Sequence, residues 1–181
     1  MSFQVVESNE MDKNLPEPWL RGTISDVDPV VAQVLYSFQQ AREDIASFTQ
    51  GLTAEQMWVQ PVGLASVGFH VRHIAGSVDR LLTYAVGRRL SDEQLATLKC
   101  EKDPGASREE LLTAMDRSLR EAEEVMRTLS AAAFNEPRVV GRKKLPTTMA
   151  GLLIHIAEHT QRHVGQAILT AKLVLATAPY A

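Results

Sequence analysis

Four long stretches of the chain repeat apolar residues every three or four positions, the spacing that gives a helix one buried face. They span about residues 28–51, 66–87, 107–130 and 147–169. Each opens with a side chain that caps the free N–H groups of a helix. These capping residues are Asp28, Ser66, Ser107 and either Thr147 or Thr148. Four such helices joined by connections of unequal length predict an all-α fold, a four-helix bundle with a long crossover connection.

The amino-terminal segment lacks this pattern. Residues 1–23 are polar, contain two prolines and show no sustained period, so we expect an N-terminal arm laid over the surface. Trp19 and Leu20 are its expected anchors. The bundle domain then covers residues 24–181.

Shorter signals lie between the long helices. The sequences TAEQ at 53–56 and SDEQ at 91–94 read as capping boxes and predict short extra helices. Residues 134–146 hold two prolines, a glycine and a basic run. We expect that segment to form the long crossover, with a brief extended pair around Gly141.

Composition excludes several classes of protein. At 181 residues, 45% apolar and 23% charged, the chain fits one globular domain. A net charge of −3 predicts no binding to nucleic acid or to an anionic membrane. The single cysteine cannot form an internal disulfide, and the amino terminus does not resemble a secretory signal, so we expect a cytoplasmic protein. The apolar stretch 167–178 is interrupted by Lys172 and is too short to cross a bilayer.

All five histidines fall in two short clusters inside expected helices. His70 and His73 form the first, and His155, His159 and His163 form the second. Residues three or four apart on a helix project from nearly the same face, so each cluster can aim at one point. A divalent metal ion explains several neutral imidazoles that converge on a common point.

His159 and His163, one helical turn apart, suit chelation of one ion. The third ligand has to come from another helix, and we favour His73, with His70 as its competitor. Three protein ligands leave a position open for water or substrate, as in catalytic rather than structural sites. Expected neighbours of the metal or of a substrate are His70, Ser77, Tyr84, His155, Glu158, Arg162 and Gln166.

Other interpretations stay open at this level. The histidines can instead be packed, hydrogen-bonded residues without a metal. The pair Arg88–Arg89 and the run 142–144 read most simply as solvated charges, with an anionic ligand as the alternative. The chain has no Gly-rich phosphate loop, no GxSxG turn and no HExxH, which excludes the usual zinc-protease arrangement.

The stretches SVGFHVRHIAGSVDRLLTYAVGRRLS and HIAEHTQRHVGQ resemble the DinB/YfiT superfamily of metal-dependent proteins over nearly the whole chain. The resemblance implies a DinB-like four-helix bundle that holds nickel or zinc. By position, the implied ligands are His73 in the HIAG segment and His159 and His163 in HTQRHVGQ. His155 lies outside the family pattern.

The resemblance also implies a function. Characterised members include thiol-dependent isomerases and transferases, so it implies a low-molecular-weight thiol as cosubstrate, a small-molecule substrate and a homodimer. We therefore expect a metal-dependent enzyme that activates a thiol or water for transfer, isomerisation or hydrolysis. The alternatives are a stress-related metal-binding protein with a structural metal, and an interaction module without metal.

Overall fold

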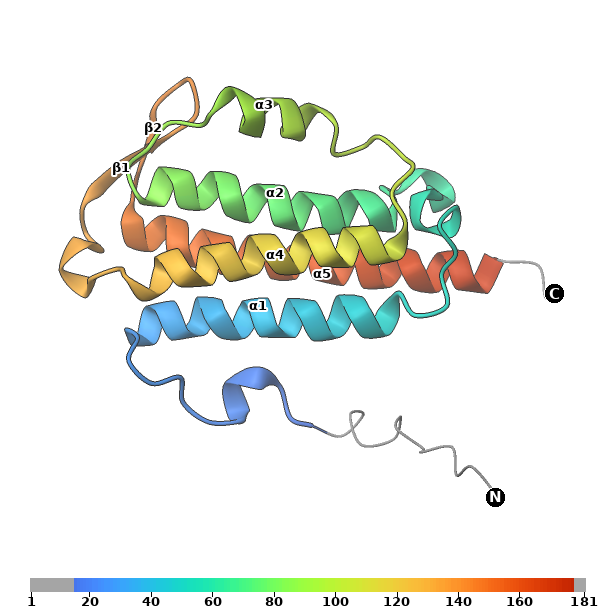
Figure 1. Ribbon diagram of the computed structural model, residues 1–181, viewed down its shortest axis with the longest axis horizontal. Coiled ribbons are helices and arrows are strands. Elements are labelled where there is room, and N and C mark those ends of the chain that lie inside the picture. The colour runs from blue at the N-terminus through green and yellow to red at the C-terminus, as the bar shows by residue number, and fades with distance from the viewer. Residues whose placement is uncertain (1–14, 178–181) are drawn as a thin grey trace, which may run out of the picture.

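Four long helices form the body of the molecule in the computed structural model, which describes residues 15–177 (Figure 1). They are α1 (Pro29–Phe48), α2 (Val67–Ala85), α4 (Arg108–Arg127) and α5 (Met149–Thr177). Short helical turns and one hairpin connect them, and no helix among the described residues has the length and apolarity to cross a membrane. These smaller elements are η2 (Pro18–Leu20), η3 (Gln56–Trp58), η4 (Pro61–Gly63), α3 (Asp92–Lys99), η5 (Ala131–Ala133), β1 (Pro137–Val140) and β2 (Leu145–Thr148).

Helix α5 packs against α1 and α2, and α4 packs against the same two helices. The expected all-α four-helix bundle is therefore confirmed. Helices α2 and α4 run in the same direction, so the chain between them has to return along the full length of the bundle, and it carries α3 on the way (Figure 1). This connection is the long crossover, which we had expected at 134–146.

The segment 134–146 instead stays at one end of the bundle and forms most of a hairpin (Figure 1). Strands β1 and β2 are antiparallel, with Pro137 opposite Thr148 and Val140 opposite Leu145. The expected extended pair around Gly141 is thus confirmed, and Gly141 takes the positive φ of 69° that the turn requires. A crossover is not needed here because α4 and α5 are antiparallel, so their adjoining ends already lie close together.

Capping chemistry sets the helix starts as the sequence predicts. Asp28 accepts a hydrogen bond from the Val30 N–H, and Ser66 accepts one from the Phe69 N–H. Reciprocal capping boxes open α3 and α4. At the start of α5, Thr148 is the cap of the two candidates, because its Oγ1 accepts from the Gly151 N–H.

The apolar stripes meet in one core, whose fully buried members include Phe38, Ile74, Leu119 and Ile156 from the four long helices. Val125 on α4 is 39% exposed, although it follows the buried Ala122 at helical spacing and precedes the buried Met126. It lies near the end of α4, where the apolar stripe is no longer fully covered.

The arm is held by polar contacts rather than by the expected anchors. Trp19 and Leu20 are 54% and 56% exposed, whereas Pro18 is buried. The guanidinium of Arg21 contacts both carboxylate oxygens of Glu43 on α1 at 2.6 and 2.8 Å. This bidentate pair ties the described part of the arm to the bundle, and residues 1–14 lie outside the described range.

Candidate metal centre

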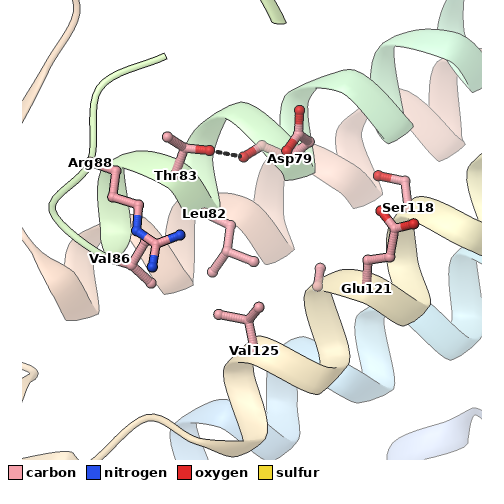
Figure 2. Close-up of a pocket in the computed structure, with 9 residues that line it drawn as sticks. Asp79, Leu82, Thr83, Val86, Arg88, Ser118, Glu121 and Val125 are labelled. Atoms are coloured by element: carbon pink, nitrogen blue, oxygen red, sulfur yellow. Dashed lines mark hydrogen bonds between the residues drawn. The ribbon is translucent and has the colours of Figure 1, made fainter. Parts of the chain in front are cut away.

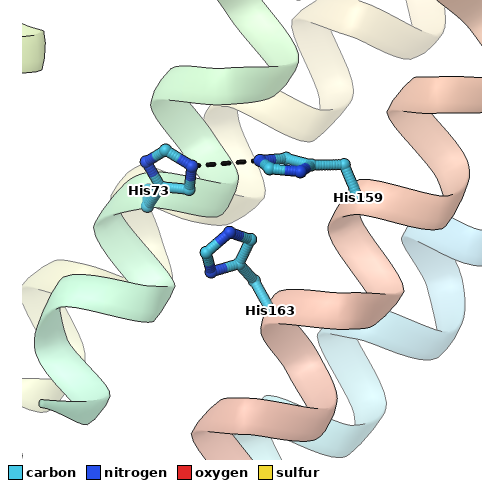
Figure 3. A group of neighbouring side chains, drawn as sticks. All are labelled: His73, His159 and His163. Carbon is cyan, nitrogen blue, oxygen red and sulfur yellow. Dashed lines mark hydrogen bonds between the residues drawn. The ribbon is translucent and has the colours of Figure 1, made fainter. Parts of the chain in front are cut away.

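His73 on α2 and His159 and His163 on α5 bring their rings together between the two helices (Figure 3). The Nε2 atoms of His73 and His159 are 3.0 Å apart. The ring centroid of His163 lies 4.4 Å from that of His73 and 4.6 Å from that of His159. These three residues form a histidine triad drawn from two helices that are far apart in sequence.

Local structure explains why the rings meet. His159 and His163 stand one turn apart on α5, so they share a face. On α2, Val71 and Ile74 are fully buried and fix the rotation of the helix, which leaves His73 directed at α5. The triad therefore follows from the packing of two amphipathic helices.

The triad fits a metal ion in its spacing. One potential ligand atom from each residue lies within 4.8 Å of the other two, and no other group of this kind occurs among residues 15–177. Two nitrogens bound at about 2.0–2.1 Å to one tetrahedral ion are roughly 3.4 Å apart. Small side-chain adjustments therefore suffice to place three imidazole nitrogens around one ion.

The protonation states also fit. Burial lowers the pKa of His159 to about 4 and that of His163 to about 3, and the nearby His73 contributes further in both cases. Both rings are therefore neutral at pH 7, with a free lone pair for a cation. Nδ1 of His159 is buried, and no group among the described residues forms a hydrogen bond with it.

Glu101 is the site residue that the sequence analysis missed. Its Oε2 lies 2.6 Å from Nδ1 of His73. A carboxylate can only accept, so Nδ1 of His73 donates to Glu101, and Nε2, which faces His159, is the nitrogen available to bind a cation. Glu101 lies in an irregular segment 28 residues after His73, and nothing in its sequence surroundings points to this contact.

The carboxylate of Glu101 is nearly inaccessible, and a second partner balances its charge. Its side chain is 3% exposed, and Oε1 lies 2.7 Å from Nη1 of Arg80, whose side chain is 9% exposed. These two atoms are close but not aligned for a hydrogen bond, so the attraction between them is that of an ion pair. Gly76 makes room for the pair: a Cβ at this position would lie 2.5 Å from Glu101 Oε1 and 2.6 Å from Arg80 Nη1.

The segment that carries Glu101 is fastened to α2. Arg72 donates to the carbonyl oxygens of Cys100 and Asp103, at 2.8 and 2.6 Å, on either side of Glu101. The Arg72 guanidinium also lies over the ring of Trp58, 4.7 Å from its centroid. Helix α2 thus carries both His73 and Arg72, the side chain that holds the Glu101 segment against the helix.

His70 lies beside the triad and outside it. It is 4% exposed, and its Nδ1 is 3.0 Å from Nδ1 of His163. Burial, aided by the nearby His73, lowers the pKa of His70 to about 4, so this ring is also neutral at pH 7. The geometry therefore groups His73 with the α5 pair and makes His70 a hydrogen-bonding neighbour of His163.

The remaining α5 candidates lie toward the surface. His155 stacks near His159, with ring centroids 5.2 Å apart, and its Nδ1 is 2.6 Å from Glu158 Oε1. Glu158 also accepts from Arg162 at 2.5 Å. Gln166 is exposed. This chain of polar groups extends outward from His159.

Two further candidates lie on α2. Ser77 is buried, and its hydroxyl donates to the Ile74 carbonyl at 3.1 Å. Tyr84 shares a helix face with His73, yet eleven residues at 1.5 Å rise place it about 16 Å along the axis. Tyr84 lines a separate hollow beside the hairpin.

A second, smaller groove of about 230 Å³ lies between α2 and α4. Asp79, Arg88 and Glu121 border it, and its floor is apolar (Figure 2). Neither this groove nor the hollow at Tyr84 is lined by a histidine. In the triad, the His73 side chain is 18% exposed and so reachable from solvent.

Residues 37–167, which include the whole triad and Glu101, match the family described as the DinB superfamily. The chain belongs to the DinB superfamily. No curated protein matches the sequence significantly. The expected family is therefore confirmed.

Solved structures agree with the fold of this DinB-superfamily member. A conserved protein from Enterococcus faecalis is 17% identical, with a TM-score of 0.65 over 80% of this chain and 96% of its own. YfiT from Bacillus subtilis, described as a probable metal-dependent hydrolase with an unusual four-helix bundle topology, is 16% identical. Its TM-score is 0.61 over 83% of this chain and 91% of its own.

Proposed function

We propose that this protein is a metal-dependent enzyme whose histidine triad holds one divalent ion, with nickel or zinc as the expected metal. The convergence of three imidazoles from two helices, open to solvent on one side, carries this proposal. Imidazole suits both metals. The description of YfiT as a probable metal-dependent hydrolase supports the same class of activity.

A divalent ion bound here would supply Lewis acidity, lowering the pKa of a bound water or thiol and polarising a carbonyl. The residues of the chain have separate roles. Glu101 fixes the tautomer and orientation of His73, and Arg80 balances the buried charge of Glu101. His70 orients His163. No fourth protein ligand closes the site among the described residues, which leaves room for a small molecule.

The reaction that we favour is hydrolysis or thiol transfer on a small molecule. Glu158 is the nearest carboxylate in sequence to the triad, and its partners His155 and Arg162 lower its effective basicity. Desolvation acts to raise the pKa of Glu158, but the hydrogen bonds and positive charges of Arg162 and His155 together outweigh it and hold this pKa below its usual value. Glu158 is therefore a weak base, which favours a nucleophile that ionises easily, such as a thiol.

Metal titration of protein purified without a histidine tag tests the site. We expect about one Zn²⁺ or Ni²⁺ per chain, and a loss of affinity of about 100-fold or more in His73→Ala, His159→Ala and His163→Ala. His155→Ala is the matched control, since His155 is 44% exposed and stands outside the triad, and it should change affinity less than about threefold. Equal occupancy in all five proteins would refute the site.

Activity is then compared in the metal-free and reloaded protein. The assay uses a panel of small esters and amides, with and without a low-molecular-weight thiol. Turnover that needs the metal and disappears in His159→Ala supports an enzyme. A fully loaded protein that turns over none of these substrates, and that unfolds when stripped, favours the second candidate, a structural metal that joins α2 to α5.

A further inference from the structure

Two basic motifs that are far apart in the sequence line one hollow at the hairpin end of the bundle. The hollow has a volume of about 910 Å³, within the range typical of small-molecule sites. Arg88 and Arg89 reach it from the segment after α2, and Arg142 and Lys144 reach it from the hairpin turn. The fold thus unites groups that the sequence presents as two separate surface charges.

The hairpin is fixed over the end of α2 by a specific contact. Nε of Arg138 on β1 donates to the Ala85 carbonyl at the end of α2 at 2.6 Å, and its Nη2 pairs with Glu136 at 2.9 Å. Gly87, with φ +75°, then turns the chain away from α2. These contacts hold the two basic motifs against each other.

The charges in the hollow are unbalanced. Among the described residues that line it, five are arginine or lysine and none is aspartate or glutamate. The side chains of Arg88, Arg89, Arg142 and Lys144 make no hydrogen bond or ion pair with any residue in the described range 15–177. Like charges gathered in a concave surface raise the local potential and attract an anion.

A role at the helix end does not account for this cluster. Cations do stabilise the carbonyl end of a helix. Here Arg138 already donates to the Ala85 carbonyl at the end of α2, while Arg142 and Lys144 belong to the hairpin turn between β1 and β2. The groove in Figure 2 offers a contrast, because Asp79 and Glu121 border it; Arg88 lines both sites, whereas Arg89, Arg142 and Lys144 line the hollow alone.

The rest of the lining is apolar or aromatic. Tyr84, Leu90, Leu95 and Val139 contribute side chains to the same hollow. Such a surface favours a ligand that carries an apolar or aromatic group next to its charge. Val139 and the phenol of Tyr84 are positioned by β1 and α2, so this part of the lining is built on regular elements.

We propose that this hollow binds a small organic phosphate. Arg89, Arg142 and Lys144 hold the phosphate, and the organic group packs against the apolar lining. The site is separate from the histidine triad, because the rise of α2 places Tyr84 about 16 Å from His73. The proposal therefore does not depend on the proposed metal chemistry.

The test measures binding of phenyl phosphate and inorganic phosphate to the full chain by calorimetry and by backbone NMR shifts. We expect phenyl phosphate to bind more tightly than inorganic phosphate, to lose affinity as NaCl is raised, and to shift the signals of Tyr84, Leu95 and Val139. In Arg89→Gln/Arg142→Gln the dissociation constant should rise tenfold or more.

The matched control is Arg117→Gln/Arg127→Gln, which removes the same two positive charges from exposed positions on α4. Its dissociation constant should stay within about twofold of wild type if the hollow is the site. Equal losses in both double variants, shifts that map outside the hollow, or no binding at millimolar phenyl phosphate would overturn the proposal. So would preferential binding of a single-stranded oligonucleotide that competes phenyl phosphate away, since the partner would then be a nucleic acid.

Discussion

Oε2 of Glu101 lies 2.6 Å from Nδ1 of His73, and this contact joins α2 to the segment that follows α3. It fixes which nitrogen of His73 carries the proton, and so which nitrogen faces α5. Because Arg80 meets the other carboxylate oxygen at 2.7 Å, the orientation of a site histidine depends on a buried ion pair. The long crossover between α2 and α4 thus contributes Glu101 to a site whose three histidines lie on α2 and α5.

Glu101→Gln should weaken metal binding without removing any imidazole. The glutamine amide can still accept from Nδ1 of His73, but it supplies no negative charge to His73 or Arg80. We expect Zn²⁺ affinity to fall about 10–100-fold. The free energy of unfolding should fall by about 3 kcal/mol, because Arg80 is left with an unpaired buried charge. Competition with a chelating dye and urea unfolding measure the two effects.

Glu93→Gln is the control for that experiment, since Glu93 is exposed on α3. It should leave both quantities unchanged. Affinity is compared at a temperature where circular dichroism shows every variant to be folded. Wild-type affinity in folded Glu101→Gln would contradict the role assigned to this carboxylate.

Gly76→Ala should destabilise the protein although alanine is the better helix former. In an open helical position this change adds about 1 kcal/mol of stability. At Gly76 the new methyl would meet the Glu101–Arg80 pair at 2.5 and 2.6 Å. We expect a net loss of about 1–3 kcal/mol, as for other overpacked sites.

Gly165→Ala on α5 provides the matched comparison. A Cβ at Gly165 would have no neighbour within 4 Å, so this variant should gain up to about 1 kcal/mol. Chemical denaturation of both metal-free variants measures the difference. Similar free energies of unfolding for the two variants would show that the Glu101–Arg80 pair can move away from the new methyl group with little loss of stability.

The local signals in the sequence were sufficient for the fold. Apolar periods and caps such as Asp28 and Ser66 depend on residues within one turn, and they placed the starts of the four long helices correctly, although α5 continues to Thr177, beyond the expected end near 169. The HxxxH spacing likewise joined His159 to His163. The position of the long crossover was missed because it depends on whether α2 and α4 run in the same direction, which is decided by packing across the whole bundle.

The neighbours of the triad could be predicted less well. Tyr84 was chosen by helical face alone, which does not record distance along the axis. Glu101 reaches His73 through a loop whose path depends on Arg72 and on the space above Gly76, and no residue pattern encodes that path. Metal ligation by the triad stays a prediction, as does the division of arm and domain at residue 24.

The stability of the metal-free protein should fall as the pH is lowered from 7 to 5. Burial first, and then repulsion from neighbouring His73, depresses the pKa of His70 and His159 to about 4 and that of His163 to about 3. The unfolded chain takes up these protons near pH 6.5, so it binds more of them than the folded chain below that value. The stabilising contribution is complete above pH 6.5 and is lost as the pH falls toward 4.

Urea unfolding at pH 7.5, 6.0 and 5.0 in the presence of a chelator measures this slope. The range above pH 5 excludes most of the titration of the paired carboxylates, such as Glu43, whose pKa the Arg21 hydrogen bond holds below its usual value. His163→Ala should flatten the slope. A midpoint that does not vary with pH in wild type would refute the assignment of neutral rings.

Removal of the metal should leave the bundle folded. Helices α2 and α5 meet through buried apolar side chains such as Val71, Ile156 and Val164, which pack whether or not an ion is present. Metal added at about 100 times its dissociation constant should stabilise the protein by about 2.7 kcal/mol through mass action, a rise in Tm of roughly 5–10 °C for a chain of this size. Thermal melts of stripped and reloaded protein measure that rise, with His159→Ala showing none. A stripped wild type without helical signal at 25 °C would instead make the ion a structural element, because the core would then be unable to hold α5 against α2 alone.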